Sequence, residues 1–374
     1  MVALLAALLP LAPITAGAET LAYIGTETSG TSQGIYVASV DEATGALSPP
    51  RLAAAIGNPN FLALHPKQRW LYAVTSRQLP GGSWKEEVAA FAVQPDGGLA
   101  LLNTQPSGGS GPCHISVDAS GRVLLLANYN GGNVVAYPLG PDGRIGPASA
   151  AVQHQGGSVH PQRQAAPHPH GIYPDPSQTR AYVPDLGLDK VLIYQLDPAT
   201  GRLTPNEPPY ATTEPGGGPR HMAFHPSARY AYVNLELSSR VAAYRLDAAT
   251  GALEAIQVLS TLPPGGTAPG NSTAETLVHP SGRFLYVSNR GHDSIAVFAI
   301  NPLDGGLRFI EATPTGGRTP RSMGFVPGGR FLVAANQNGG TVTVFSVDPE
   351  HGTLTPTGST LPIDRPNHIR FLQR

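Results

Sequence analysis

The chain has 374 residues and a formal net charge of −1, and only 13% of its residues are charged. It contains no run rich in Lys or Arg, which argues against binding to nucleic acid or to an anionic membrane surface. Cys113 is the single cysteine, so neither an intrachain disulfide nor a cysteine-based metal site is possible. Glycine and proline are abundant, at 44 and 38 residues, and the hydrophobic residues fall in regular runs of Val, Tyr and Phe. These features favour many short strands joined by turns.

The N-terminal segment MVALLAALLPLAPITAGAET carries an apolar run of about 15 residues, shorter than the ~20 that a membrane-spanning helix needs. The run ends at Ala16-Gly17-Ala18, a small-x-small cleavage pattern. We interpret residues 1–18 as a signal peptide and expect a periplasmic or secreted protein with no membrane association after its removal. No Lys or Arg precedes the run, so the alternative is a cytoplasmic protein in which this segment is not a signal.

One unit then recurs along the chain. It consists of a lead segment that usually contains proline, a strand, an HPxGR turn, a strand such as FLYV, a variable loop, a strand such as VAVF, and a turn such as LDxxTGxL. The lead segments are Asn58-Pro59, Gly111-Pro112, Pro167–His170, Gly218-Pro219, Ser272–Ala274, Thr319-Pro320 and Arg365-Pro366. The first copy, at 20–50, lacks its lead strand, and the last copy, RPNHIRFLQR, has only that strand.

Four short strands in a repeat of about 40–50 residues are typical of a β-propeller. Six whole units and one split unit predict an all-β, seven-bladed β-propeller that forms a single domain over residues 19–374. The two partial copies complement each other, so we expect the C-terminal strand to join the N-terminal blade and close the ring without an open sheet edge.

The repeated and the variable segments fall on opposite faces of such a ring, because successive turns of an antiparallel meander alternate between its two ends. The HPxGR and LDxxTGxL turns share one face and repeat for reasons of turn chemistry. The loops NRGHDS, NLELSS and NQNGGT and the links between blades share the other face and diverge. A site for one asymmetric ligand needs such divergence, so we expect it at the mouth of the central channel on this face.

The polar residues of the variable face are unevenly spread. The link at 153–171 supplies Arg163, Gln164, His168 and His170, the next link supplies Arg220 and His221, and other segments add Glu27, Glu236, Glu275, Arg290 and His292. We predict that arginines, carboxylates and a histidine from this set converge on one side of the mouth.

Other candidates have structural interpretations. The turn residues His65, His225, His279, Arg122, Arg229, Arg283 and Arg330 occupy repeated positions and are expected to support the fold. Arg321 in TPRSMGF is the counterpart of Arg220 in GPRHMAF, so a structural role stays open for Arg220. Surface ion pairing is the alternative for Glu236 and Arg290, and Cys113 is expected to be packed rather than catalytic. No calcium-loop spacing, zinc motif or Gly-x-Ser-x-Gly elbow occurs, so we expect no metal and no other cofactor.

The motifs PHPHG, GPRHMAFHP, VNLELSSRVAAY, HPSGRFLYVSNRGHDSIAVF and DRPNHIRF together resemble the seven-bladed lactonase family, over nearly all of the chain after about residue 20. That family includes propeller-type 6-phosphogluconolactonases and carboxy-cis,cis-muconate lactonizing enzymes. The resemblance implies metal-independent chemistry at a lactone, with a functional cluster at His170, Arg220, Glu236 and Arg290. The same four residues belong to the set that the variable face singles out.

The sequence therefore predicts a lactonase of the carboxylic ester hydrolase class that acts on a small sugar-acid lactone by general acid–base catalysis. Glu236 or His170 would be the base, and Arg220 and Arg290 would hold the carbonyl oxygen. Residues expected to bind the substrate are Arg163, Gln164, His168, His221, Glu275 and His292. The alternatives are a lactonizing cyclase acting on a muconate-like diacid, and a non-catalytic exported binding module. We expect a monomer; an exported protein would not meet a phosphorylated cytoplasmic lactone, so export favours a different lactone.

Overall fold

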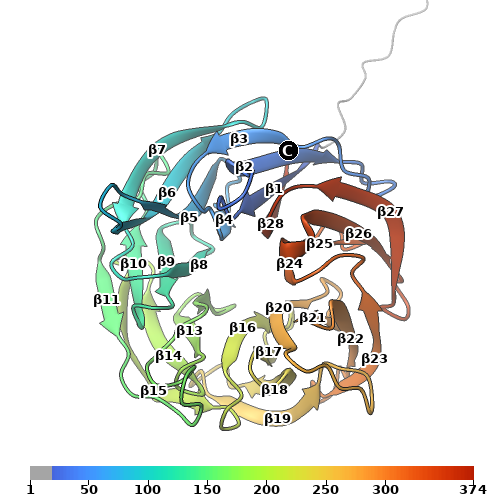
Figure 1. Cartoon of the computed structure of the whole chain (residues 1–374). Coiled ribbons are helices and arrows are strands. Elements are labelled where there is room, and N and C mark those ends of the chain that lie inside the picture. Colours follow the sequence, from blue (N-terminus) through green and yellow to red (C-terminus); the bar gives the residue numbers. More distant parts are fainter. Residues whose placement is uncertain (1–18) are drawn as a thin grey trace, which may run out of the picture.

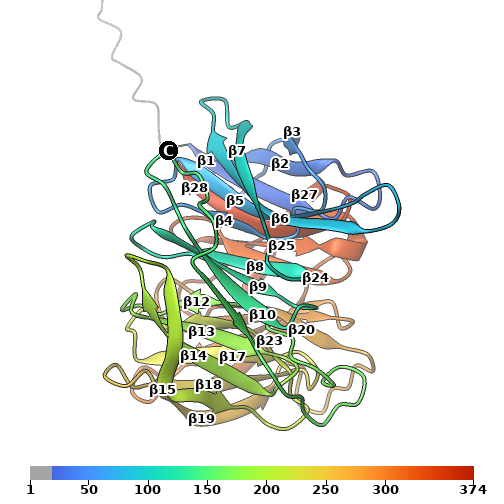
Figure 2. The ribbon, with the colours of Figure 1, turned by 90° about the vertical axis from the view of Figure 1, so that its left-hand side faces the viewer.

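The computed structural model describes residues 19–374, and the interpretation of residues 1–18 as a signal peptide lies outside this range. Seven four-stranded antiparallel sheets surround a common axis, face-on in Figure 1 and turned by 90° in Figure 2. The predicted all-β, seven-bladed propeller is therefore confirmed. The described chain contains no helix with the length and apolar character needed to cross a bilayer.

The blades follow the chain, each with four strands in sequence order except the first, whose order is β28-β1-β2-β3. The strands of the first three blades are β1 (Thr20–Thr26), β2 (Gly34–Val40), β3 (Arg51–Ala55), β4 (Leu62–Leu64), β5 (Trp70–Gln78), β6 (Trp84–Val93), β7 (Leu99–Pro106), β8 (Pro112–Val117), β9 (Val123–Asn128), β10 (Asn133–Pro138) and β11 (Ala150–Gln153). Those of the fourth and fifth are β12 (Tyr173–Pro174), β13 (Arg180–Asp185), β14 (Lys190–Asp197), β15 (Arg202–Thr212), β16 (Pro219–Phe224), β17 (Tyr230–Leu235), β18 (Arg240–Leu246) and β19 (Leu253–Ser260). The remainder are β20 (Ser272–Val278), β21 (Phe284–Arg290), β22 (Ser294–Ile300), β23 (Leu307–Pro314), β24 (Pro320–Phe325), β25 (Phe331–Asn336), β26 (Thr341–Val347), β27 (Leu354–Pro362) and β28 (Pro366–Gln373), with a short 3-10 helix, η1, at Gln337–Gly339.

The ring closes as the two partial copies of the repeat predict. β28 pairs antiparallel with β1, from Thr20 opposite Gln373 to Gly25 opposite His368. In Figure 1 the red C-terminal strand therefore lies beside the blue N-terminal strand, at the inner edge of the first blade. This pairing removes the exposed edge that a partial blade would otherwise present.

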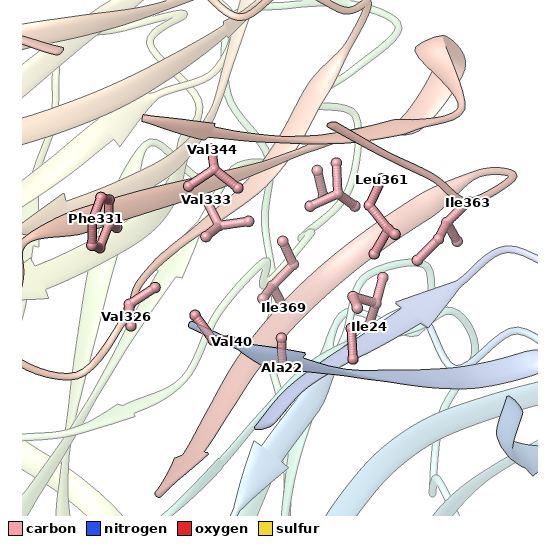
Figure 3. Packing of buried hydrophobic residues seen from close by; sticks show 13 residues of the cluster. Ala22, Ile24, Val40, Val326, Phe331, Val333, Val344, Leu361, Ile363 and Ile369 are labelled. Atoms are coloured by element: carbon pink, nitrogen blue, oxygen red, sulfur yellow. The ribbon is translucent and has the colours of Figure 1, made fainter. Parts of the chain in front are cut away.

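Apolar clusters between adjacent blades hold the ring together. The cluster in Figure 3 joins the last blade to the closing one through the buried side chains of Ile24, Val333, Val344 and Ile369, among others. Alternation along each strand places one set of side chains toward the preceding blade and the other toward the following blade. Because both faces of a blade are covered, the middle strands are apolar on both sides and read as continuous runs such as VLLLAN in β9.

The repeated turns also make contacts between blades. The Nε2 atoms of His65, His225 and His279 lie 3.0, 2.8 and 3.1 Å from the carbonyl oxygens of Gly121, Gly282 and Gly329 in the next HPxGR-type turn. A carbonyl oxygen only accepts, so each imidazole donates here. A Cβ atom on Gly121 would lie 2.3 Å from His65 Nε2, and its φ is +70°, so glycine is required there twice over. The structural role predicted for these three histidines is confirmed.

Candidate active site

The innermost strand of each blade starts at the variable face, and the residue after its lead proline points to the channel mouth. In the six blades that have this proline, these residues line one of two adjoining cavities: Asn60, Cys113, His170, Arg220, Arg321 and Asn367. The sixth blade has Ala274 at this position instead. Six of the seven blades thus contribute one side chain at this position, and the six are of four residue types.

A bulge in β16 brings a second consecutive side chain to the channel. Pro219 pairs with Leu235 and Met222 with Val233, so Arg220 and His221 together face the single residue between those two partners. Both Arg220 and His221 consequently line the smaller cavity, although strict alternation would send one of them into the blade.

The larger cavity has a volume of about 470 Å³. Its lining residues are Asn60, Ser76, Glu86, Gly111, Pro112, Cys113, Tyr129, Asn130, Arg163, His170, Glu236, Arg290 and Arg321. The smaller cavity, of about 50 Å³, shares Asn60, Pro112, Cys113 and Arg321 with it and is otherwise lined by Phe61, Arg220, His221, Glu275, Ser322, Asn367 and His368. The volume of the larger cavity is in the range typical of small-molecule sites, and the smaller one has room for about a water molecule or two.

Glu236 is the centre of the charged groups. Its Oε2 lies 3.0 Å from Arg220 Nε and 3.1 Å from Arg290 Nη2, and its Oε1 accepts a 2.7 Å hydrogen bond from Arg163 Nη2. His170 Nε2 lies 3.8 Å from the same Oε2. The four residues that the sequence singled out are therefore brought together, with Arg163 as a fifth.

The backbone explains why Glu236 reaches the mouth. It directly follows β17, and its N–H donates to the carbonyl of Gly218 at 2.7 Å. Gly218 has φ of +66° and ends the link that leads into β16. The start of the variable loop is thereby fixed beside Arg220, so the carboxylate and its guanidinium partner are placed by neighbouring strands of one blade.

Several buried polar atoms of this cluster lack an aligned hydrogen-bond partner in the described part of the protein. Within residues 19–374, Glu236 Oε2, Arg220 Nε, Arg290 Nε and His170 Nδ1 are buried yet have no aligned hydrogen-bond partner. The contacts of Arg220 and Arg290 with Oε2 are thus ion pairs that lack the alignment of hydrogen bonds. Native proteins leave few such groups unpaired, and the exceptions concentrate at functional sites.

Burial and neighbouring charges set the ionisation of the cluster. Burial raises the pKa of Glu236, but Arg290 and Arg220, followed by His170 and Arg163, outweigh it and hold this pKa well below its usual range. Burial, with the charge of Arg220 next, holds the pKa of His170 well below its ordinary value. The site at neutral pH therefore combines an ionised carboxylate, cationic arginines and a neutral imidazole.

Two buried aspartates fix the long link before the fourth blade, and part of this link faces them instead of the cavity. Asp185 Oδ1 accepts from the backbone N–H of His168, and Asp189 Oδ1 accepts from Gln164 Nε2 at 2.7 Å in each case. Gln164 is fully buried and is not among the lining residues of either cavity, so the structure does not bring it into the cluster. His168 is not among the lining residues and packs against one of them, Tyr129. The two ring centroids are 4.4 Å apart, and His168 Nδ1 hydrogen-bonds to the Tyr129 carbonyl.

The remaining predicted residues lie at different places. His221 and Glu275 line the smaller cavity, with His221 Nδ1 2.9 Å from Glu275 Oε1. His292 is exposed, bonds to Ser294, and is absent from the lining of both cavities. Glu27 pairs with Arg365 at 3.2 Å, also away from them. The structure therefore does not bring His292 or Glu27 into the cluster.

Other lining residues were not predicted from the sequence. Arg321, Tyr129 and Cys113 line the larger cavity, and Tyr129 Oη accepts a 3.1 Å hydrogen bond from Arg163. The signal that could have found Arg321 and Cys113 is their position directly after a lead proline. Burial raises the pKa of the Cys113 thiol to about 12, so it stays protonated and suits packing rather than nucleophilic attack.

Metal ligands do not gather at the mouth. Among the residues that the structure describes, no group of three or more His, Cys, Asp or Glu side chains could hold a metal ion. The chemistry available to this chain's own residues is that of a carboxylate, an imidazole and several guanidinium groups.

Comparison with known proteins agrees with this architecture. A model of the family "Lactonase, 7-bladed beta-propeller" matches residues 21–371. The 6-phosphogluconolactonase of Bacillus subtilis is 40% identical over 356 residues, which are 95% of this chain and 99% of that protein. The 6-phosphogluconolactonase of Formosa agariphila is 31% identical over 272 residues, or 72% and 75% of the two chains.

A solved structure shows the same fold. The periplasmic gluconolactonase of Pseudomonas aeruginosa superposes with a TM-score of 0.88 and 34% identity, over 95% of this chain and 99% of that chain. Family, relatives and fold thus agree over almost the whole described ring. The chain belongs to the seven-bladed β-propeller lactonase family.

Proposed function

We propose that this protein is a carboxylic ester hydrolase that opens a sugar-acid lactone, as a 6-phosphogluconolactonase-like enzyme, at the Glu236 cluster. The observation that carries the proposal is one buried carboxylate contacted by Arg163, Arg220 and Arg290, beside a neutral His170, at the wall of a cavity of about 470 Å³. The activities named for the relatives from Bacillus subtilis and Pseudomonas aeruginosa support it.

The arginines serve the developing negative charge. Attack on a lactone carbonyl places charge on its oxygen, and preorganised donors in a site that excludes water stabilise that charge strongly. Arg290 lines the larger cavity and Arg220 the adjoining smaller one, and both guanidinium groups lie beside Glu236 Oε2. Glu236 holds both guanidinium groups in place before substrate arrives, so no reorganisation is needed during the reaction.

His170 is the better candidate for the base. The arginines keep Glu236 ionised with a pKa well below its usual range, which makes it a weak proton acceptor. Burial lowers the pKa of His170 as well, so the choice rests on position. Three arginines contact Glu236, whereas His170 lines the larger cavity with a free Nδ1 within residues 19–374, and Glu236 Oε2 at 3.8 Å stabilises the imidazolium that forms. The hydrolytic water gives its proton to His170 as its oxygen bonds to the carbonyl carbon. The ring C–O bond then breaks, and His170 returns the proton to the leaving alkoxide.

The cavity also has charge for an anionic substituent. The two cavities carry four guanidinium groups, those of Arg163, Arg220, Arg290 and Arg321, against the carboxylates of Glu86, Glu236 and Glu275. Within residues 19–374 Arg321 has no ion-pair partner. Burial lowers its pKa to about 9, so the side chain is still cationic at neutral pH. A buried unpaired cation is costly, and a phosphate or carboxylate on the substrate would offset that cost.

The location of the protein, exported or cytoplasmic, decides whether its lactone is unphosphorylated or phosphorylated. Export, as in the periplasmic gluconolactonase from Pseudomonas aeruginosa, fits an unphosphorylated lactone, and a cytoplasmic protein fits the phosphorylated one. A panel of both lactones, followed by base consumption at constant pH, tests the proposal. Saturable turnover of either lactone supports a lactonase, and only background hydrolysis of every lactone in the panel would contradict it.

A further inference from the structure

A chain of contacts reaches Arg220 from the side opposite to Glu236. Glu275 Oε1 lies 2.9 Å from His221 Nδ1, and His221 Nε2 lies 3.1 Å from Arg220 Nη1. All three side chains are buried, and Glu275 and His221 line the smaller cavity but not the larger one. Arg220 lines the smaller cavity as well, and its Nε lies 3.0 Å from Glu236 Oε2, which belongs to the wall of the larger one. Glu275 and His221 are therefore linked to the larger cavity through Arg220 and Glu236.

The chemistry of the donors fixes where the imidazole proton lies. A guanidinium group can only donate, so His221 Nε2 must present its lone pair to Arg220. The single proton of the neutral ring is then on Nδ1, where it is donated to Glu275. Burial, with the charge of Arg220 next, holds the pKa of His221 well below its ordinary value, which keeps the ring in this neutral form.

The backbone reinforces the same arrangement. The His221 N–H donates to Asn234 Oδ1 at 2.9 Å, and Asn234 Nδ2 donates to the carbonyl of Ala274 at 3.2 Å. That carbonyl also accepts from Arg220 Nη1. The guanidinium of Arg220 is thus gripped by an imidazole and a carbonyl, while its Nε faces Glu236.

Glu275 is itself held at this position. Its Oε1 also accepts from the Thr276 N–H at 3.1 Å, and its Oε2 from Ser322 Oγ at 3.4 Å. The sixth blade thus provides the acceptor and the fifth blade the imidazole and the arginine. A side chain without an acceptor at position 275 would leave the His221 ring free to carry its proton on Nε2, where it would point at the donors of Arg220.

We propose that Glu275 and His221 are positioning residues: Glu275 fixes the Nδ1-protonated tautomer of His221, and His221 holds the guanidinium of Arg220 against Glu236. The consequence for catalysis rests on the proposed lactonase function, whereas the tautomer and the placement of Arg220 do not. Such an arrangement affects turnover more than substrate affinity, because it aligns a charge-stabilising group that acts mainly in the transition state.

The test combines spectroscopy with kinetics on the full chain. Nitrogen NMR of isotope-labelled histidine, with the His221 signal assigned by its loss in His221→Gln, should show a neutral ring protonated at Nδ1. In Glu275→Leu the Nε2-protonated form should appear and the Arg220 Nε–H signal should shift, and in Glu275→Gln, which retains an acceptor oxygen, most of the wild-type pattern should return. The exposed Glu254→Leu is the matched control.

The kinetic arm separates positioning from binding. Glu275→Leu should lower kcat for lactone hydrolysis by about 10- to 100-fold with little change in KM, and Glu275→Gln should recover most of that loss. A wild-type His221 protonated at Nε2, or an unchanged Arg220 signal in Glu275→Leu, overturns the proposal. A rise in KM for both Glu275 variants at unchanged kcat also overturns it, in favour of substrate binding. If the NMR pattern is as expected but no lactone is hydrolysed, the positioning stands and the proposed function fails.

Discussion

Arg290 and Glu236 meet across a blade boundary, with Nη2 of the arginine 3.1 Å from Oε2 of the carboxylate. Arg290 ends β21 in the sixth blade, and Glu236 follows β17 in the fifth. Glu236 also pairs with Arg220 of its own blade, but its contact with Arg290 forms only because the ring brings two blades together. This explains how a fold built from near-identical units provides one asymmetric site.

Glu236→Gln should remove most of the activity while keeping the shape of the side chain. The carboxamide cannot neutralise Arg220 and Arg290, so these groups repel each other and lose their alignment. We expect kcat/KM for lactone hydrolysis to fall by about 10²–10³-fold, the range typical of disrupting an oxyanion-stabilising donor. Circular dichroism should confirm that the variant is folded; wild-type turnover in a folded variant would remove Glu236 from the mechanism.

The stability difference between the wild type and Glu236→Gln should depend on pH. A carboxylate whose pKa is depressed by folding stabilises the fold at pH values above its unfolded pKa, near 4.5, and this contribution is lost as the pH falls toward the folded pKa. Glu236→Gln should therefore be less stable than the wild type at pH 7, by about 3–5 kcal/mol if it behaves as a broken buried ion pair. Urea unfolding at pH 7 and pH 3 measures the difference, which should shrink at pH 3; an equal difference at both would contradict the assignment.

Arg321→Gln should weaken binding of an anionic lactone. Arg321 lines both cavities, and a charge-assisted hydrogen bond to it is worth about 1.5–3 kcal/mol, so KM should rise by roughly tenfold or more with a smaller effect on kcat. Arg283→Gln is the control, since Arg283 lies in an HPxGR turn and donates to the carbonyls of Pro349 and Glu350. Steady-state kinetics with a phosphorylated and an unphosphorylated lactone should show the larger KM change for the phosphorylated one. A KM of Arg321→Gln equal to that of the wild type would count against anion binding by Arg321.

Ile369→Ala should show how much the closing strand β28 contributes to the stability of the ring. Ile369 is fully buried on β28 and packs in the cluster of Figure 3 against residues of the last blade. Truncating a buried isoleucine typically costs about 2–5 kcal/mol. Chemical unfolding should show this loss, whereas Leu303→Ala, at a side chain that is 81% exposed, should stay within about 0.5 kcal/mol of the wild type. Equal stability of the two variants would mean that the closing strand contributes little.

The sequence was sufficient for the fold because its signals are periodic. The split repeat, the HP turns and the lead prolines each predict strand pairing that the structure contains, including the pairing of β28 with β1. Repetition of the HP turns predicts a structural role for their histidines, and the contacts of these histidines with glycine carbonyls in the next blade confirm it.

The site was predictable where a position differed from its counterparts in other blades. His170, Glu236 and Arg290 met that criterion, and they lie together with Arg220, which has a counterpart in Arg321. Gln164 met it too, but it is bound by Asp189, a buried partner that no sequence pattern marks. Arg321 does not meet the criterion, because it repeats the position of Arg220. In a ring, however, equivalent positions of different blades face the same channel, and Arg321 lines both cavities.

The most direct test of the lactonase site compares two arginine variants in one assay. Acid release from a lactone at constant pH should give a kcat/KM for Arg290→Ala about 10²–10³-fold below the wild type, since Arg290 borders both Glu236 and the cavity. Arg283→Ala, a matched removal of a guanidinium from the opposite face, should stay within about threefold of the wild type, because surface changes of this kind alter little. A folded Arg290→Ala protein that turns over lactone as fast as Arg283→Ala would contradict the account.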